Sequence, residues 1–452
     1  MSATAARNTD RLVGLDGLRG ILLLCVITVH VMGALNPVVL STVRFDIFGQ
    51  AIVVFFVMSG FLIYWPFAAA LLRDRPQPSL KVYVTSRLLR VYPGYLAIFL
   101  LSAVLLSAVY VSNATLSLEH YSDAGTGGIH DPLRVLLHMT VLQNYLPSEL
   151  QTGLNPSWTL TVELTFYALL PLLAAGAAWL VVRRGVGRFT AALLPAIALL
   201  AIGVVARVVG LVIEKASGMG ILEAEWGDNP LGVFSRSLLV WSDNFGLGMI
   251  AVVLFLAVKS GVDIRVGRLP LRLLCVFVGL AGLALTAVCM ATAPRFISAA
   301  FGLFSAALVL FLLLPTHAGG VSRLARAFDV QPLHYLGVIS LSAYLWHYPV
   351  LIIVTRLGWF AGETPLGAAQ NVVVVALLTV AAASATYWAV ERPAQAWASR
   401  IRRADQARRR PPGATPAAPT PAAEPAPAAP AAAEPAVAGN ASARDGDPAS
   451  TS

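Results

Sequence analysis

Apolar runs of about 18 to 25 residues recur along most of this chain, and each can cross a hydrocarbon core roughly 30 Å thick as an α-helix. The chain has 452 residues, of which 57% are hydrophobic and only 12% are charged. A soluble domain carries about 25% charged residues on average. The sequence therefore predicts an all-α, polytopic transmembrane helical bundle. It excludes a cytosolic enzyme, a secreted disulfide scaffold and a free nucleic-acid binder.

Turn and charge signals between the apolar runs predict about ten spans. We place them at residues 13–35, 47–71, 93–112, 157–182, 189–213, 236–258, 273–292, 297–314, 335–355 and 367–390. They form one membrane domain over residues 13–395, preceded by a short segment, 1–12. The tail, 396–452, is basic as far as Arg410 and then rich in alanine and proline. Because the Ala/Pro-rich part has almost no large apolar side chains to bury, we expect it to be disordered.

The positive-inside rule predicts that both termini lie in the cytoplasm, because the basic residues gather in alternate connections. These residues are Arg7, Arg11, Arg73, Arg75, Lys81, Arg87, Arg90, Arg183, Arg184, Arg188, Lys259, Arg265, Arg268, Arg272, Arg323, Arg326 and the arginines from Arg400 to Arg410. The same bias accounts for the net charge of +9. That charge therefore indicates topology, and we expect the lipid bilayer but no nucleic acid as a partner.

Ionisable side chains inside a span are expensive unless they are paired or face a cavity, so each is a candidate for a functional role. The first span holds Asp16, Arg19 and His30. Arg19 and His30 are 11 residues apart, which places them on one helix face with a separation of roughly 16 Å. Asp16 precedes Arg19 by three residues, where an ion pair can form. The alternative is that Asp16 and Arg19 anchor the span at the interface while His30 bonds within the bundle.

A second candidate lies in the predicted internal loop from Lys81 to Pro93. If the segment before Pro93 is helical, Arg87 and Arg90 share a face beside the membrane. Paired arginines grip phosphate through forked hydrogen bonds. Ordinary arginines of a cytoplasmic loop are the alternative interpretation.

Two later spans each carry a polar stripe. In span four, Glu163 and Tyr167 are four residues apart, so they share a face below the helix start at Pro156. In span nine, Ser340, Tyr344 and His347 share a face. Such stripes serve as interhelical contacts or as substrate contacts. Two further buried charges, without a predicted partner, are Arg207 and Asp243.

Six segments, in order, resemble those of the bacterial acyltransferase-3 family of integral membrane acyltransferases. They are Leu15–Gly20 followed by His30, Phe55–Ile63, Arg87–Arg90, Ser157–Pro171, Ser340–Pro349 and Glu391–Pro393. The resemblance covers residues 10–395, and an ordered set of six is far more specific than any single segment. One position departs from the family pattern, because Val53 stands where members have an acidic residue. The esterase-like domain fused to some members is not expected here.

The resemblance implies a membrane O-acyltransferase that takes an acyl group, by default acetyl, from cytoplasmic acyl-CoA as co-substrate. The acceptor would be a hydroxyl of a carbohydrate, a glycolipid or a glycosylated metabolite, and the location a bacterial inner membrane. Arg19, Arg87 and Arg90 would bind the phosphates of coenzyme A, with His30 as the base. Glu163 would orient the acceptor or hold the tautomer of His30. The expected substrate-binding residues are Asp16, Ser59, Trp158, Tyr167, Tyr344 and His347.

Two questions stay open at this stage. The acyl group could pass directly to the acceptor or through an acyl-histidine intermediate. A transporter or flippase would place the same charges along a translocation path, and broken helices in two corresponding halves would favour it. No metal is expected, because Cys25, Cys275 and Cys289 have no ligand-like spacing.

Overall fold

The computed structural model describes residues 12–117, 119–316 and 320–408. The chain forms one compact unit up to Asp405, and a second unit begins at Gln406. The long helices are α1 (Leu15–Leu35), α3 (Ala51–Leu72), α4 (Leu80–Leu100), α6 (Trp158–Arg184), α7 (Arg188–Ser217), α10 (Leu238–Lys259), α11 (Leu271–Thr292), α12 (Ile297–Leu313), α15 (Ser340–Arg356), α16 (Pro365–Thr386) and α17 (Arg392–Arg408). The Ala/Pro-rich tail and most of the N-terminal segment lie outside the described residues.

Short elements connect the long helices. The short helices are α2 (Pro37–Val43), α5 (Pro132–Met139), α8 (Ile221–Trp226), α9 (Pro230–Ser235), α13 (Arg323–Phe328) and α14 (Gln331–Val338). The strands form two antiparallel pairs, β1 (Val109–Tyr110) with β2 (Thr126–Gly127) and β3 (Arg265–Val266) with β4 (Leu269–Pro270).

The predicted all-α membrane bundle is confirmed. In the described part of the chain, nine helical segments are long and apolar enough to cross a membrane. A tenth span results if α14 and α15, which meet at 76°, are counted together. This is one broken pair, and no second one occurs among the described residues. The side of the membrane on which the termini lie stays a prediction.

The third span differs from its predicted position. The segment from Lys81 to Pro93, expected to be an internal loop, is helical and forms most of α4, which continues as a π-helical turn to Leu105. Pro93 does not end this helix, because neighbouring helices in a membrane protein can satisfy the backbone groups that a proline frees. Arg87 and Arg90 therefore lie on a spanning helix rather than in a loop.

The last span is longer than predicted. A π-helical turn, Tyr387–Glu391, joins α16 to α17, so that the helix continues past the expected end at residue 390. Pro393 follows this turn in the first turn of α17, and the helix continues past it to Arg408. π-helical turns are frequent at functional sites. Glu391, in this turn, accepts a hydrogen bond from Ser342 of α15.

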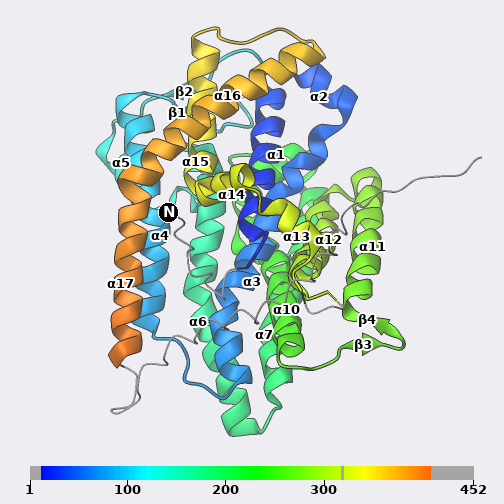
Figure 1. The fold of residues 1–452 in the computed structure, drawn as a ribbon. Coiled ribbons are helices and arrows are strands. Elements are labelled where there is room, and N and C mark those ends of the chain that lie inside the picture. Colours follow the sequence, from blue (N-terminus) through cyan, green and yellow to red (C-terminus); the bar gives the residue numbers. More distant parts are fainter. Residues whose placement is uncertain (1–11, 118, 317–319, 409–452) are drawn as a thin grey trace, which may run out of the picture. The chain divides into compact units, whose positions relative to one another are not determined.

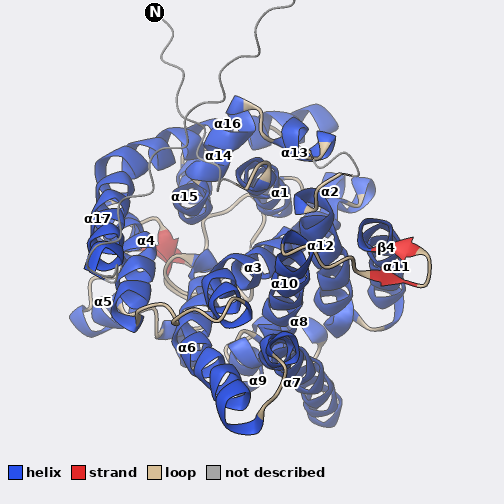
Figure 2. Ribbon diagram, turned by 60° about the horizontal axis from the view of Figure 1, so that its bottom comes forward, coloured by secondary structure: helices blue, strands red, loops and turns tan. Residues whose placement is uncertain are grey.

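Helices α3 and α10 lie inside the bundle, with α4 and α17 on one side and α11 on the opposite side (Figure 2). Two glycines permit the close contact of α3 with α10. A Cβ atom on Gly60 would lie 2.3 Å from the carbonyl oxygen of Phe245, and one on Gly248 would lie 2.0 Å from that of Val57. Both distances are far below van der Waals contact. Either substitution would therefore force the two helices apart.

The two ends of the bundle differ in composition (Figure 1). One end, which we call the basic face, carries the α3–α4 and α6–α7 connections with Arg73, Arg75 and Arg188. The other end, which we call the far face, carries residues 36–50, 106–157 and 357–364, among them the longest connection. Backbone at this end therefore has the length to cover the bundle.

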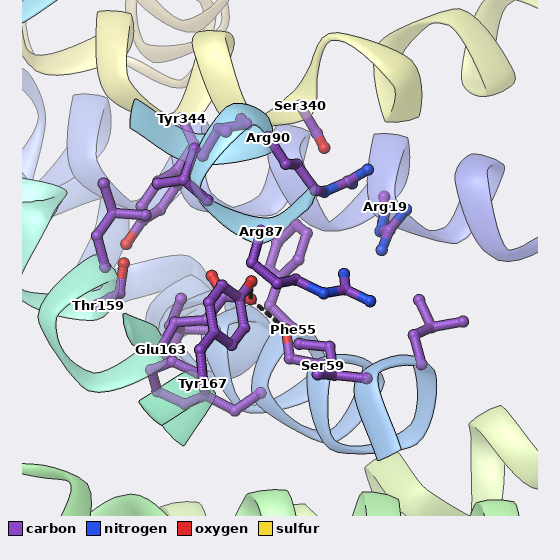
Figure 3. A pocket seen from close by; sticks show the side chains of 17 residues that line it. Arg19, Phe55, Ser59, Arg87, Arg90, Thr159, Glu163, Tyr167, Ser340 and Tyr344 are labelled. Atoms are coloured by element: carbon purple, nitrogen blue, oxygen red, sulfur yellow. Dashed lines mark hydrogen bonds between the residues drawn. The ribbon is translucent and has the colours of Figure 1, made fainter. Parts of the chain in front are cut away.

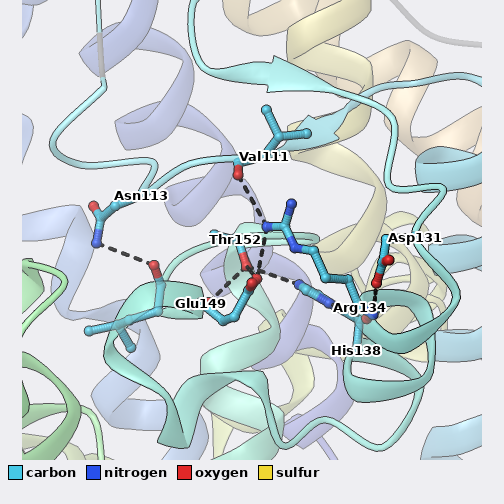
Figure 4. Close-up of polar contacts among 8 residues, drawn as sticks. Val111, Asn113, Asp131, Arg134, His138, Glu149 and Thr152 are labelled. Atoms are coloured by element: carbon cyan, nitrogen blue, oxygen red, sulfur yellow. Dashed lines mark hydrogen bonds and ion pairs between the residues drawn. The ribbon is translucent and has the colours of Figure 1, made fainter.

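Polar contacts hold the longest far-face connection in place (Figure 4). Arg134 pairs with Glu149 at 2.8 Å and also donates to the carbonyl oxygen of Val111. His138 contacts the hydroxyl group of Thr152 at 3.0 Å through Nε2 and the carbonyl oxygen of Arg134 at 2.8 Å through Nδ1. Burial lowers the pKa of His138, which favours its neutral form here. These contacts join distant parts of the connection to one another, and Tyr95 of α4 donates to the carbonyl oxygen of His138 at 2.6 Å, which ties the connection to the bundle.

Candidate functional site

The first turns of α1 pack directly against α13 and α14, and this contact positions Arg19. A Cβ atom on Gly17 would lie 1.5 Å from the carbonyl oxygen of Phe328, and one on Gly337 would lie 1.7 Å from that of Asp16. Only glycine fits at either place. Asp16 pairs with Arg19 at 3.2 Å, as the three-residue spacing predicted.

A cavity of about 220 Å³, which we call the arginine cavity, lies between α1, α3, α4, α6 and α15. Arg19, Arg87 and Arg90 line it, and Figure 3 shows their three guanidinium groups on one side of the space. These residues come from helices α1 and α4, far apart in the sequence. The sequence-predicted phosphate ligands therefore meet at one place.

The opposite wall of the arginine cavity is a carboxylate held by two hydroxyl groups (Figure 3). Ser59 donates to Oε1 of Glu163 at 2.8 Å, and Tyr167 donates to the same oxygen at 2.6 Å. Charge-assisted bonds of this kind are stronger than neutral ones, so they fix the carboxylate in one position. Glu163, Ser59 and Tyr167 thus act as one group.

The cations of this cavity are only partly neutralised. Among the described residues, neither Arg87 nor Arg90 forms an ion pair with a carboxylate. Arg87 lies over the rings of Tyr83 and Tyr167, and its Nε has no hydrogen-bond partner. Such an arrangement favours an anionic ligand, because arginine binds phosphate oxygens in a forked geometry.

A second cavity, of about 450 Å³, holds His30 and is called the histidine cavity below. Far-face connections supply part of its lining, including Tyr110, Thr115 and Gln151. Helices supply three tryptophans, Trp158, Trp226 and Trp241. This cavity is thus built differently from the arginine cavity, whose lining residues all lie on spanning helices.

The two cavities share lining residues. Ile52 of α3 and Tyr344 of α15 line both. On α1, Arg19 lines the first cavity and His30 the second, so that one helix face serves both. The two cavities are therefore neighbours, with Ile52 and Tyr344 between them.

The hydrogen bonds of His30 fix which of its nitrogens is free. Nδ1 of His30 lies 3.0 Å from Nε2 of His347, and Nδ1 of His347 contacts the carbonyl oxygen of Tyr344 at 2.5 Å. A carbonyl oxygen only accepts, so Nδ1 of a neutral His347 carries the proton and its Nε2 accepts from His30. Nε2 of His30 is then left without a proton. A lone pair at this nitrogen is what a general base requires.

The structure places Glu163 and His30 in different surroundings. Glu163 was expected either to orient the acceptor or to hold the tautomer of His30, but the side chain that contacts Nδ1 of His30 is His347. Glu163 lines the arginine cavity and bonds to Ser59 and Tyr167, so its carboxylate is already engaged there. His30 lines the other cavity.

The remaining predicted residues fall into three positions. Ser59, Tyr167 and Tyr344 line the arginine cavity, and Trp158 and Tyr344 line the histidine cavity. Asp16 and His347 line neither cavity. Asp16 instead forms a hydrogen bond with Arg19, and His347 forms one with His30. Four further residues of the histidine cavity were not predicted from the sequence: Trp226, Trp241, Arg236 and Arg295. Arg236 and Arg295 lie at helix ends, where they resemble ordinary interfacial arginines.

The two buried charges without a predicted partner bind each other. Arg207 of α7 donates to both oxygens of Asp243 of α10, at 2.7 and 3.1 Å. Both side chains are almost completely buried. This pair also lies beside the histidine cavity, because Arg207 is one of its lining residues.

Comparisons with known proteins agree with this arrangement. The sequence model of the family described as an acyltransferase domain, the acyltransferase-3 family, matches residues 12–389. No curated protein and no solved structure matches the chain. The matched region includes every residue that lines the two cavities. The chain therefore belongs to the acyltransferase-3 family of membrane acyltransferases.

Proposed function

We propose that this protein is an O-acyltransferase of a bacterial inner membrane. It transfers an acyl group, with acetyl as the first candidate, from cytoplasmic acyl-CoA to a hydroxyl group of a carbohydrate, glycolipid or glycosylated metabolite. The observation that carries the proposal is the hydrogen-bonded chain from Tyr344 through His347 to His30, which leaves Nε2 of His30 able to accept a proton.

The arginine cavity supplies a site for the phosphates of the donor. Arg87 and Arg90 have no carboxylate partner in the part of the chain that the structure describes, and Arg402 of α17 is close enough to be repelled by both. A cluster of like charges is stabilised when an anion binds between them. The pantetheine arm would then run along α1 toward His30, a distance of roughly 16 Å along the helix.

The chemistry at His30 follows from its free nitrogen. The oxygen of the acceptor hydroxyl attacks the thioester carbon while Nε2 of His30 takes the hydroxyl proton. The carbon–sulfur bond then breaks, and the protonated imidazole returns the proton to the leaving thiolate. The products are an ester and free coenzyme A, and His30 is regenerated.

Replacing His347 tests whether it positions His30. In His347→Leu the acceptor for Nδ1 of His30 is lost, and we expect kcat to fall by about 10- to 100-fold, because an unsatisfied buried group costs ~1–3 kcal/mol. The KM for acetyl-CoA should not change, since His347 does not line the arginine cavity. The rate of labelled acetyl transfer from acetyl-CoA, measured with purified protein in nanodiscs, gives both constants.

His347→Gln provides the matched control, because its amide oxygen can take the place of Nε2 as an acceptor. This variant should recover a substantial part of the lost kcat. Equal losses in both variants, accompanied by a higher KM, would mean that His347 only supports the packing of α15.

A further inference from the structure

The histidine cavity has the features of a binding site for a second substrate. It is about twice the volume of the arginine cavity, at 450 against 220 Å³, and His30 lies in its wall. Its polar lining includes Gln50, Gln151 and Asn155, all with uncharged amide groups. Sites of this size with aromatic walls and a few placed polar groups are typical of small-molecule recognition.

The aromatic wall of this cavity is a connected cluster. The ring centroids of Trp158 and Trp226 lie 5.8 Å apart with the rings at 86°, and those of Trp158 and Trp241 lie 5.3 Å apart. The guanidinium group of Arg236 lies 3.1 Å from the centroid of the Trp226 ring. The tryptophans that line the cavity are thus held rigidly, so that contact with a ligand would cost little conformational entropy.

Every arginine in the wall of the histidine cavity is already neutralised. Arg236 pairs with Glu225 at 3.1 Å and Arg295 pairs with Glu214 at 2.6 Å. Arg207 is held by both oxygens of a buried carboxylate, as described above. This is the reverse of the arginine cavity, where two guanidinium groups have no such partner. The second cavity therefore offers no unpaired charge to an anionic ligand.

Two hydrogen-bond donors in this wall have no partner. Nε2 of Gln151 and Nη2 of Arg295 form no hydrogen bond, although the two side chains are only 2% and 3% exposed. Buried donors are nearly always satisfied, and an unsatisfied one costs free energy. Two of them on residues that line one cavity indicate a ligand that supplies oxygen acceptors.

We infer that the histidine cavity binds the acceptor, and that the group it holds is a neutral, hydroxyl-bearing ring such as an uncharged sugar rather than an acidic sugar or a phosphate. The tryptophans contact the carbon–hydrogen faces of the ring, and Gln151 and Arg295 donate to its oxygens. This inference rests on the proposed function and narrows the class of acceptor that the enzyme would use.

The test uses the full chain in nanodiscs, which leave both faces accessible, with labelled acetyl-CoA and a panel of probes. The neutral probes are the methyl glycosides of glucose, galactose, mannose and rhamnose, and the charged probe is methyl glucuronide. We expect label on at least one neutral glycoside and none on the glucuronide. In Trp226→Leu the KM for that glycoside should rise about tenfold, as expected when one packed aromatic contact is lost. The KM for acetyl-CoA should be unchanged.

Trp179→Leu is the matched control, because Trp179 is exposed on α6 and lines neither cavity. It should behave as the wild type. Transfer to the glucuronide alone, or a glycoside KM unaffected by Trp226→Leu, would overturn the inference. The inference would also be overturned if the wild type consumed acetyl-CoA but labelled no glycoside. In that case the proposed function would still hold. If the wild type does not consume acetyl-CoA at all, the proposed function itself fails.

Discussion

Replacing His30 by alanine is expected to lower kcat for acyl transfer by about 10²- to 10⁴-fold, the usual contribution of a positioned general base. Of the two unprotonated ring nitrogens in the His30–His347 pair, Nε2 of His347 accepts a hydrogen bond from His30, and Nε2 of His30 is the one left with a free lone pair. Without it, the acceptor hydroxyl must attack the thioester with its proton still attached. The KM for acetyl-CoA should stay the same, since His30 does not line the arginine cavity.

His120→Ala is the control for this experiment, because His120 is an exposed histidine of the far face that lines neither cavity. It should transfer acyl groups at the wild-type rate. Wild-type kcat in His30→Ala would remove His30 from the mechanism. A raised KM with unchanged kcat would assign it to donor binding instead.

Replacing Asp243 by leucine is expected to cost about 3–5 kcal/mol of folding stability, because it leaves the charge of Arg207 buried and unpaired. The side chains of Asp243 and Arg207 are 0% and 3% exposed, so water cannot take the place of the lost partner. Arg207 keeps only its bond to the carbonyl oxygen of Arg295. The shift of the unfolding transition in nanodiscs measures the effect.

Two controls test whether the expected loss of stability comes from leaving a buried charge unpaired. The double variant Arg207→Met/Asp243→Leu should recover much of the loss, because replacing both members of a buried pair by apolar residues is often neutral. Asp263→Leu breaks the ion pair of Asp263 with Arg265, whose side chains are 65% and 57% exposed. This variant should change the folding stability by less than about 1 kcal/mol. If Asp243→Leu were equally harmless, the Arg207–Asp243 pair would contribute nothing to the fold.

Local pattern was sufficient to predict the spans and the shared face of α1. Apolar run length places the spanning helices, and the 11-residue spacing of Arg19 and His30 fixes their common side. The predicted position of the third span was wrong because a proline and charged residues were interpreted by the rules that hold for soluble proteins. Pro93 and the arginines before it suggested a loop, yet they lie within α4 because a membrane helix tolerates both.

Contacts between distant parts of the chain could not be predicted from the sequence alone. His30 and His347 are 317 positions apart, and nothing in either helix specifies that their rings meet. Likewise, Arg207 and Asp243 each looked unpartnered until the packing of α7 on α10 brought them together. The histidine cavity was missed for the same reason, because Gln151 lies in a long connection and Trp226 in the short helix α8, and no periodic pattern describes their folded path.

The central claim is that phosphates of the donor bind in the arginine cavity while the chemistry takes place at His30. The most direct measurement compares acetyl-CoA with acetyl-pantetheine, which lacks the phosphates of acetyl-CoA, as donors for the same protein. The wild type should prefer acetyl-CoA through a lower KM. Arg87→Gln/Arg90→Gln should lose that preference and still use acetyl-pantetheine, whereas His30→Ala should lose kcat with both donors. An undiminished preference for acetyl-CoA in the arginine variant, or wild-type transfer by His30→Ala from either donor, would contradict the claim.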